Sequence, residues 1–115
     1  MRHTAAAIVV ALSTMLAGNA YSFTAAELYK YCTAPKYGDR DVGCTLYVRG
    51  LIDGLYLGHN LSKDEFPLCA NSIDAAQARL IVERFMREHP EFLHQEAGVV
   101  GGIALQKIFG CKKSQ

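Results

Sequence analysis

Apolar residues recur every three or four positions along most of the chain, which is the spacing of one face of an α-helix. The clearest example lies between residues 72 and 88, where an apolar stripe consists of Ala75, Ala78, Ile81, Val82, Phe85 and Met86. The charged side chains of this segment lie largely off the stripe: Arg79, Glu83, Arg84 and Arg87. No strand-like alternation competes with this pattern. The sequence therefore predicts an all-α fold, a small disulfide-stapled bundle of about four helices.

Signals for helix starts divide the chain into four segments, which cover residues 24–32, 41–59, 72–88 and 90–109. Thr24 and Glu27 have the spacing of a capping box at the start of the first segment. Asn71 or Ser72 caps the third segment, and Pro90 opens the fourth, because proline is favoured in the first turn of a helix. The inward row of the fourth helix is then Leu93, Ala97, Val100, Ala104 and Ile108.

Glycine occupies every fourth position of the second predicted helix, at Gly50, Gly54 and Gly58, so that all three lie on one face. Each glycine costs about 1 kcal/mol relative to alanine in a helix interior, and a closely packed neighbouring helix would offset this cost. Gly98 and Gly102 repeat the spacing in the fourth segment. We therefore expect the second and fourth helices to cross closely along these helix-packing glycines. A kink at residues 101–102 is the alternative.

Asp53 is an acidic residue among apolar neighbours in the second predicted helix. This position predicts a buried carboxylate that supports helix packing by pairing with Arg49, one turn earlier, or with the end of another helix. The alternative is that Asp53 belongs to a binding surface.

The first twenty residues have the pattern of an export signal. A short basic start is followed by an apolar run over residues 5–17, which is too short to span a bilayer comfortably. Small residues near its end predict cleavage after Ala20 or Ser22. We expect a signal peptide at residues 1–20, one helical domain at residues 21–115 and an exported protein without a stable membrane anchor. An uncleaved anchor is the alternative.

The charge of the exported part is balanced. The full chain has 12 basic and 11 acidic residues, and removal of Arg2 with the signal peptide leaves a formal charge of zero. A nucleic-acid partner would require a basic face, so the balance speaks against one. It speaks equally against electrostatic attachment to anionic lipids.

All four cysteines lie in the exported part, and an even number in a short secreted chain predicts two disulfides. In an up-and-down bundle Cys32 and Cys44 lie at one end, and Cys69 and Cys111 at the other. The second helix separates these ends by roughly 25 Å, whereas bridged Cα atoms lie within about 7 Å. We expect the pairs Cys32–Cys44 and Cys69–Cys111, although the loop 60–71 could carry Cys69 back along the bundle.

No constellation of side chains suited to catalysis or metal binding is apparent. His59, His89 and His94 have no carboxylate or cysteine at a spacing that dictates contact. The spacing of the cysteines fits neither a zinc site nor haem attachment, and no phosphate-binding glycine loop is present. We expect no catalytic residues, cofactor or metal, and therefore a protein that is not an enzyme.

Two loops are candidates for partner binding. The first, at residues 36–41, is closed by the predicted Cys32–Cys44 bridge and carries Tyr37, Asp39 and Arg40. The second, at residues 60–67, carries Asp64, Glu65 and Phe66. A loop held by a disulfide loses little entropy when it docks, which suits a protein inhibitor. An ordinary solvated connection is the alternative for any single residue.

Taken together, the motifs resemble the Rap/Tai family of type VI secretion amidase immunity proteins. The resemblance covers nearly the whole exported part and rests on Phe23-Thr24, Cys44-x-x-Tyr47-x-x-Gly50-x-x-Asp53-Gly54, Cys69, Gln77, His89-Pro90, Ala97, Ala104-Leu105 and Phe109-x-Cys111. One departure is Gly110, where many members of the family have proline.

The resemblance implies a periplasmic, all-helical protein, often a homodimer. Its partner would be a peptidoglycan amidase injected by a neighbouring cell, whose active-site cleft it would plug by steric occlusion without catalysis. The competing hypothesis is a periplasmic acid-stress chaperone, which would loosen at low pH to expose apolar surface. A helical binding protein with another partner is a further alternative, and a small hydrolase ranks last.

Overall fold

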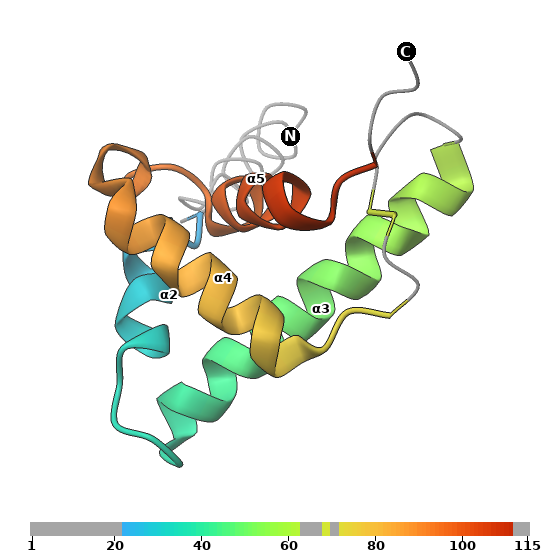
Figure 1. Ribbon diagram of the computed structural model, residues 1–115. Coiled ribbons are helices and arrows are strands. Elements are labelled where there is room, and N and C mark those ends of the chain that lie inside the picture. Colours follow the sequence, from blue (N-terminus) through green and yellow to red (C-terminus); the bar gives the residue numbers. More distant parts are fainter. Residues whose placement is uncertain (1–21, 63–67, 70–71, 112–115) are drawn as a thin grey trace, which may run out of the picture.

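Helices dominate the computed structural model (Figure 1), which describes residues 22–62, 68–69 and 72–111. Its elements are α2 (Ala25–Cys32), α3 (Asp39–Ser62), α4 (Ala75–Glu88), the 3-10 helix η1 (Pro90–Phe92) and α5 (Ala97–Phe109). The predicted all-α class with four helices is confirmed. The predicted signal peptide at residues 1–20 lies outside the described residues, as do the candidate contacts Asp64, Glu65 and Phe66.

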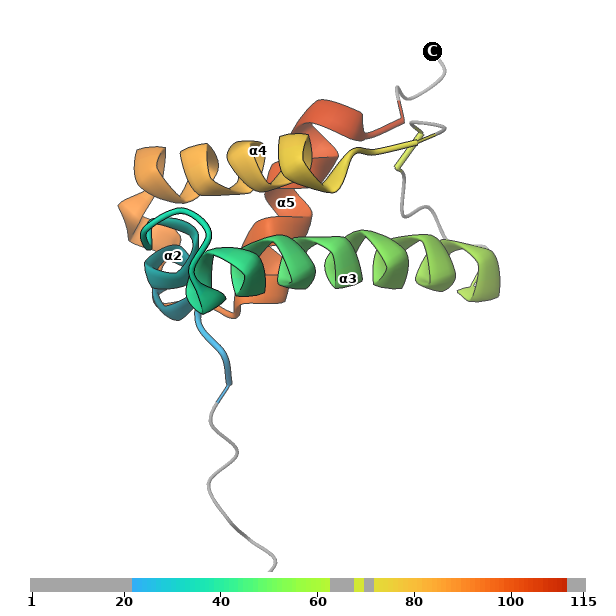
Figure 2. The same ribbon diagram turned by 90° about the horizontal axis from the view of Figure 1, so that it is seen from below.

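The helices cross one another rather than forming a parallel bundle. Figure 1 shows α4 crossing α3, with α5 across the opening between them and the short α2 beside the start of α3. The view from below places α3 and α4 in two separate layers (Figure 2). The far end of α3 extends beyond α4 in this view.

The core lies where all four helices face inward. Leu28, Val48, Val82 and Leu105 are almost completely buried and come one from each helix. Burying an aliphatic side chain of this size contributes about 1.5–3 kcal/mol, so these contacts hold the crossing helices together. On α4 the predicted stripe is buried at Ala78, Val82, Phe85 and Met86. On α5 the predicted inward row holds at Ala97, Val100 and Ala104 and is wrong at Ile108, which is exposed near the end of the helix.

The predicted capping box begins α2. Glu27 N–H donates to Oγ1 of Thr24 at 3.3 Å, and Thr24 N–H donates to Oε2 of Glu27 at 2.8 Å. These bonds satisfy backbone donors that a helix start leaves without partners. The hydrogen bond from the Thr24 backbone lowers the pKa of Glu27, with a smaller contribution from the Thr24 side chain.

The fourth predicted segment is interrupted before α5 begins. Pro90 opens only the 3-10 helix η1, and α5 starts at Ala97. The carbonyls of Leu93 and Gln95 accept hydrogen bonds from Ala26 N–H at 2.9 Å and Ala25 N–H at 2.8 Å. Because the first N–H groups of α2 need acceptors, this stretch bonds to α2 instead of continuing a helix of its own. The expectation of one helix from residue 90 is wrong for this reason.

Asp74, and not Ser72 or Asn71, caps α4. Its Oδ2 accepts the N–H of Gln77 at 3.1 Å, and α4 begins at the next residue, Ala75. Ser72 lies in a non-helical segment before this cap, and Asn71 lies outside the described residues. The expected cap was therefore placed two or three residues too early.

Both disulfides have the pairing expected from the sequence. Cys32 and Cys44 are joined with their Cα atoms 5.0 Å apart, and Cys69 and Cys111 with theirs 4.8 Å apart. The first bridge ties the end of α2 to the start of α3. The second ties the segment before α4 to the end of α5, where Cys69 N–H also donates to Phe109 O at 2.8 Å. In the chain-entropy model these closures stabilise the fold by about 3 and about 4 kcal/mol.

The expected glycine crossing of α3 and α5 is wrong. Gly50, Gly54 and Gly58 are exposed, and a Cβ atom built on any of them would meet no atom within 4 Å. Gly102 is buried, yet its Cβ would also have open space, whereas that of Gly98 would lie 3.6 Å from Tyr47 Oη.

The close approach of the two helices occurs at Gly101, where a Cβ would lie 2.6 Å from Leu51 Cδ2. Helix α5 continues through residues 101–102. The face of α3 with Val48, Leu51 and Ile52 packs inward because it removes more apolar area from water than a glycine row can.

Asp53 is exposed, so the expectation of a buried helix-packing carboxylate is wrong. Its predicted partner is right: Oδ2 lies 3.9 Å from Nε of Arg49. Both side chains are more than half exposed, and an exposed pair of this kind contributes little to stability.

Candidate functional site

An ion pair between Arg79 of α4 and Asp41 of α3 lies at the junction of three helices. The side chains are only 16% and 12% exposed, and Nη1 of Arg79 contacts Oδ1 of Asp41. The guanidinium also donates from Nη2 to Cys32 O at 2.9 Å and from Nη1 to Thr45 Oγ1 at 3.3 Å. Arginine suits this position because its planar fork offers several donors with fixed directions. One side chain therefore binds the end of α2 to the start of α3.

Asp41 connects this ion pair to the preceding loop. Its Oδ2 accepts the backbone N–H of Tyr37 at 2.8 Å. The hydrogen bond from Tyr37 is the main cause that lowers the pKa of Asp41, and the hydrogen bond from Arg79 adds to it. Asp41 is thus held as a carboxylate, and its two oxygens hold the loop and α4 at the same time.

Tyr37 has an unusual backbone conformation and an exposed side chain. Its φ is 67°, and no other non-glycine residue in the described part of the chain has a positive φ. The left-handed region disfavours a bulky side chain and costs about 1–3 kcal/mol. The side chain is 93% exposed, so it gains almost nothing from the fold that holds it. Such strain often marks a functional position.

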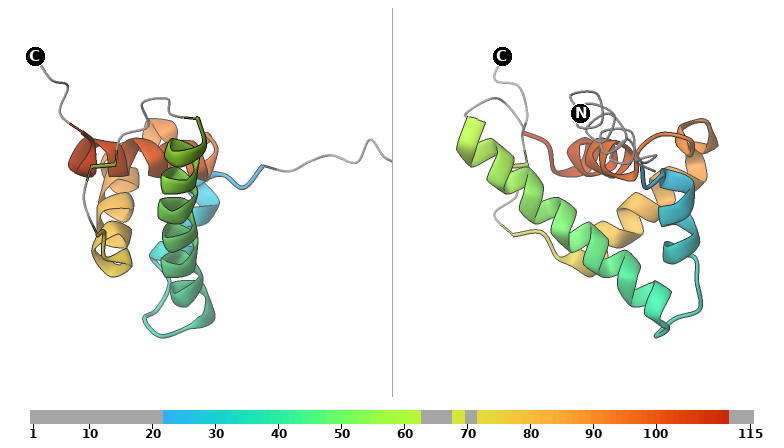
Figure 3. Two further views of the ribbon diagram at one scale, coloured as in Figure 1. Left: turned by 90° about the vertical axis from the view of Figure 1, so that its right-hand side faces the viewer. Right: turned by 180° about the vertical axis from the view of Figure 1, so that it is seen from behind.

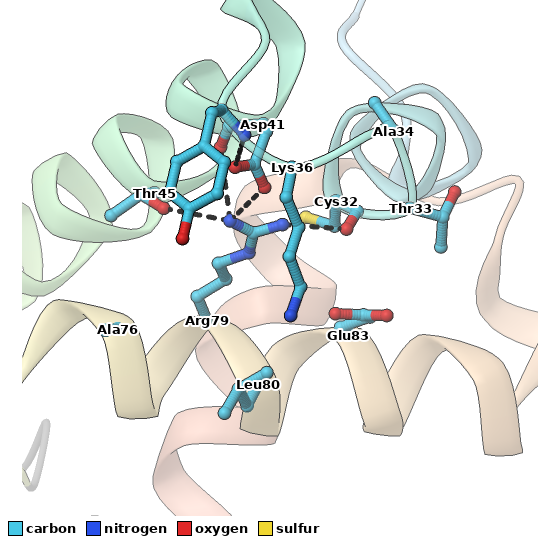
Figure 4. A pocket seen from close by; sticks show the side chains of 11 residues that line it. Cys32, Thr33, Ala34, Lys36, Asp41, Thr45, Ala76, Arg79, Leu80 and Glu83 are labelled. Carbon is cyan, nitrogen blue, oxygen red and sulfur yellow. Dashed lines mark hydrogen bonds and ion pairs between the residues drawn. The ribbon is translucent and has the colours of Figure 1, made fainter.

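A hollow of about 510 Å³ lies between the end of α2, the loop, the start of α3 and α4 (Figure 4). The Arg79–Asp41 pair forms part of its wall, and Lys36 and Glu83 lie on the same side of it in Figure 4. Its lining residues are Cys32, Thr33, Ala34, Lys36, Tyr37, Asp41, Thr45, Ala76, Arg79, Leu80 and Glu83.

Arg79 and Asp41 were not singled out from the sequence. Arg79 was expected off the apolar stripe of α4, which is wrong. Residue 79 follows Ala75 by four positions and precedes Val82 by three, so helical periodicity places it beside the buried row. An arginine at such a position requires a buried partner, and this signal could have identified it.

The structure brings one of the two predicted loops to the site. Tyr37, Asp39 and Arg40 are all exposed, and Tyr37 lies in the turn between α2 and α3, bonded to Asp41. Asp39 and Arg40 form the first turn of α3, which begins two residues earlier than expected. Of the predicted second loop, residues 60–62 belong to the end of α3, and residues 63–67 lie outside the described residues.

The histidines lie away from this site. His59 and His94 are exposed. The ring of His89 packs on Phe85 with centroids 4.3 Å apart, and its Nδ1 lies 3.2 Å from Oε1 of Glu91. Over the described ranges, no three histidine, cysteine or acidic side chains lie close enough together to hold a metal ion. Nor does any helix in those ranges have the length and apolar character needed to cross a membrane.

The described residues thus form a small disulfide-bridged all-α domain with an exposed aromatic side chain in the turn between α2 and α3. The family model described as Rap1a immunity proteins matches residues 24–111. The chain therefore belongs to the Rap1a immunity protein family, and the resemblance to the Rap/Tai family is confirmed. Searches among curated proteins and among solved structures gave no match. Membership implies that the protein binds a cognate effector, and proteins of this family are generally not enzymes.

Proposed function

We propose that this chain is a periplasmic immunity protein that binds a type VI secreted peptidoglycan amidase and occludes its active-site cleft. The observation that carries the proposal is the family match, which spans all four helices. Inhibition would be steric: the protein fills the cleft and contributes no reacting group.

The rigidity of the domain supports an occluding role. Two disulfides and the Arg79–Asp41 pair hold the helices and the loop before α3 in one arrangement. A surface that is ordered before binding loses less conformational entropy on association. The candidate contacts are Tyr37 on this loop, Asp39 and Arg40 in the first turn of α3, and Asp64, Glu65 and Phe66 on the predicted second loop.

Export is part of the proposal. Disulfides persist in oxidising compartments such as the periplasm. Cleavage after Ala20 would leave the capping box at Thr24 intact, and also the hydrogen bond from Ala97 N–H to Phe23 O at 2.9 Å. The proposed mature chain is the single domain 21–115.

The proposal extends to a homodimer through the outer face of α3. Seen from behind, α3 lies in front of α4 (Figure 3). Four large apolar side chains on this helix are exposed: Val42, Leu46, Leu57 and Leu61. At 100° per residue they share one face with Gly50 and Gly54.

The order of residues on this face is nearly the same in both directions. Reversal about the midpoint of the row exchanges Val42 with Leu61 and Leu46 with Leu57, and it exchanges Arg49-Gly50 with Asp53-Gly54. A second copy packed antiparallel would therefore place Val42 against Leu61 at both ends of the row and Leu46 against Leu57 one turn further in. It would also bring Arg49 of one copy next to Asp53 of the other and allow close backbone approach at the glycines. Self-complementarity of this kind is what a two-fold interface requires.

The test of the proposed function requires the cognate amidase, for which a small cysteine/histidine amidase encoded next to this gene would be the first candidate. Expression of the amidase alone in the periplasm should lyse the cells, and co-expression of this protein should protect them. In vitro, the purified protein should inhibit peptidoglycan hydrolysis fully when one binding site is present for each amidase molecule. A version without residues 1–20, kept in the cytoplasm, is the matched control and should not protect. Absence of a complex at micromolar concentration would overturn the proposal.

A further inference from the structure

We infer that Tyr37 is the anchor by which this protein docks to its effector, and that Asp41 and Arg79 are positioning residues that preset its conformation. This inference rests on the proposed function and assigns the contact to one side chain. The partner it fits is a protein surface with an apolar pocket for an aromatic ring and a hydrogen-bonding group for a phenol hydroxyl.

The first argument is exposure. The Tyr37 side chain is 93% exposed, more than any other large hydrophobic side chain in the described ranges. The fold therefore gains nothing from an aromatic ring at this position. Tyrosine is enriched among the residues that dominate binding free energy, because it buries a large area and loses little rotamer entropy.

The second argument is the conformation in which the ring is presented. The left-handed φ of 67° would not persist in a free loop, since it disfavours a bulky residue. The bond from Tyr37 N–H to Asp41 holds it, and Arg79 holds Asp41 in turn. Arg79 is itself fixed by Cys32 O and Thr45 Oγ1. The position of Tyr37 is thus determined by three helices and not by the loop alone.

The third argument is the surroundings of the ring. The disulfide between Cys32 and Cys44 closes the loop at its base. Leu80, which is exposed, lines the hollow beside the loop and offers apolar surface to a side chain of the partner. Lys36, Asp39 and Arg40 lie within three residues of Tyr37 in the sequence and are exposed charged residues. An aromatic anchor within a polar rim is the common anatomy of a protein–protein interface.

The test measures the affinity of the purified protein for its cognate amidase by isothermal titration calorimetry. Tyr37→Ala should weaken binding at least about 30-fold, the loss typical of an anchor residue. Tyr37→Phe keeps the ring and removes only the hydroxyl group. Its loss of affinity should therefore be smaller than that of Tyr37→Ala. Val99→Ala on α5 is the matched control, because Val99 is also exposed. Val99 lies near the start of α2, whereas the loop that carries Tyr37 follows the end of α2. The Val99→Ala substitution should therefore leave the affinity unchanged.

The outcomes separate this inference from the proposed function. If the unaltered protein binds no amidase, the proposed function fails and the inference fails with it. If the unaltered protein binds and Tyr37→Ala binds equally well, the function stands and the inference is overturned.

The positioning role is tested by a double-mutant cycle. Asp41→Asn should weaken binding about tenfold through loss of preorganisation, yet it should cost nothing further in a Tyr37→Ala background. Independent, additive losses would mean that Asp41 acts through the general stability of the fold and would overturn its role. If Asp41→Asn does not fold, Thr45→Val replaces it in the double-mutant cycle with Tyr37→Ala. This substitution removes only one hydrogen bond of Arg79, so the expected loss of affinity is smaller.

Discussion

Tyr37 donates its backbone N–H to Oδ2 of Asp41 at 2.8 Å, and this bond closes the turn between α2 and α3. The same carboxylate pairs with Arg79, which lies 38 positions further along the chain. A local turn is therefore held by a distant residue. Its geometry depends on the complete fold, and the following predictions test that dependence.

The stability that Asp41 contributes should depend on pH. Its pKa in the folded protein lies below the ordinary value of 3.8, because the ionised carboxylate accepts hydrogen bonds from Tyr37 and Arg79. This contribution is present above pH 3.8 and is lost as the pH falls through the lowered pKa. The difference in melting temperature between the unaltered protein and Asp41→Asn should therefore be largest near neutral pH and shrink in acid.

Asp53→Asn is the control for this experiment, because its carboxylate is exposed on α3. It should change the melting temperature little at any pH. A constant difference for Asp41→Asn across the whole range would contradict the assignment. Binding of a dye specific for apolar surface should stay low in the same acid samples, and a strong rise would favour the acid-stress chaperone instead.

Tyr37→Gly should separate stability from binding. Glycine adopts a positive φ without strain, which recovers about 1–2 kcal/mol, while its greater freedom in the unfolded chain costs about 0.5–1 kcal/mol. The free energy of unfolding in urea should therefore stay equal or rise by about 1 kcal/mol, although amidase binding is lost. Tyr37→Ala is the matched comparison, since it also lacks the ring and retains the strain. A marked loss of stability in Tyr37→Gly would show that the ring supports the fold.

Alanine should act differently at two glycines that both lie inside helices, Gly54 of α3 and Gly101 of α5. Gly54→Ala fills open space on α3 and should raise the free energy of unfolding by about 1 kcal/mol through helix propensity. Gly101→Ala gains the same propensity but places its Cβ 2.6 Å from Leu51 Cδ2, so the leucine must move. Its net effect should be smaller than that of Gly54→Ala or reversed. Urea unfolding of dilute samples, in which any dimer is dissociated, is the measurement, and equal gains would contradict the observed crossing.

The proposed dimer predicts that Leu57→Asp yields a monomer. Leu57 is exposed on the outer face of α3, so the substitution should leave the melting temperature of the dilute monomer nearly unchanged while it breaks the interface. Size-exclusion chromatography with light scattering gives the mass directly. Val99→Asp introduces the same charge at an exposed site on α5 and should remain dimeric. A monomeric unaltered protein at high concentration would remove the dimer from the proposal.

Much of the fold was predictable because its causes are local. The capping box of Thr24 and Glu27 lies within one turn, and the apolar stripe of α4 follows from helical periodicity. The disulfide pairing followed from the order of helices together with the reach of a bridge. Each of these arguments needs only neighbouring residues or the length of one helix.

The orientation of α3 was not predictable in this way. The helix carries apolar side chains on both faces, Val48 and Ile52 on one and Leu46 and Leu57 on the other. Periodicity therefore does not distinguish the buried face, and the glycine spacing pointed to the wrong one. The choice between two such faces is a competition for apolar area against the other helices, which only the assembled structure decides.

The helical class, the disulfide framework and the family could be predicted from the amino-acid order, because they depend on local patterns and on the spacing of a few residues. The pairing of Arg79 with Asp41, which holds Tyr37 in a strained, exposed conformation, became visible only in the folded protein. The physical reason is that a buried charge requires a partner, but the partner can come from any segment that the fold brings within reach.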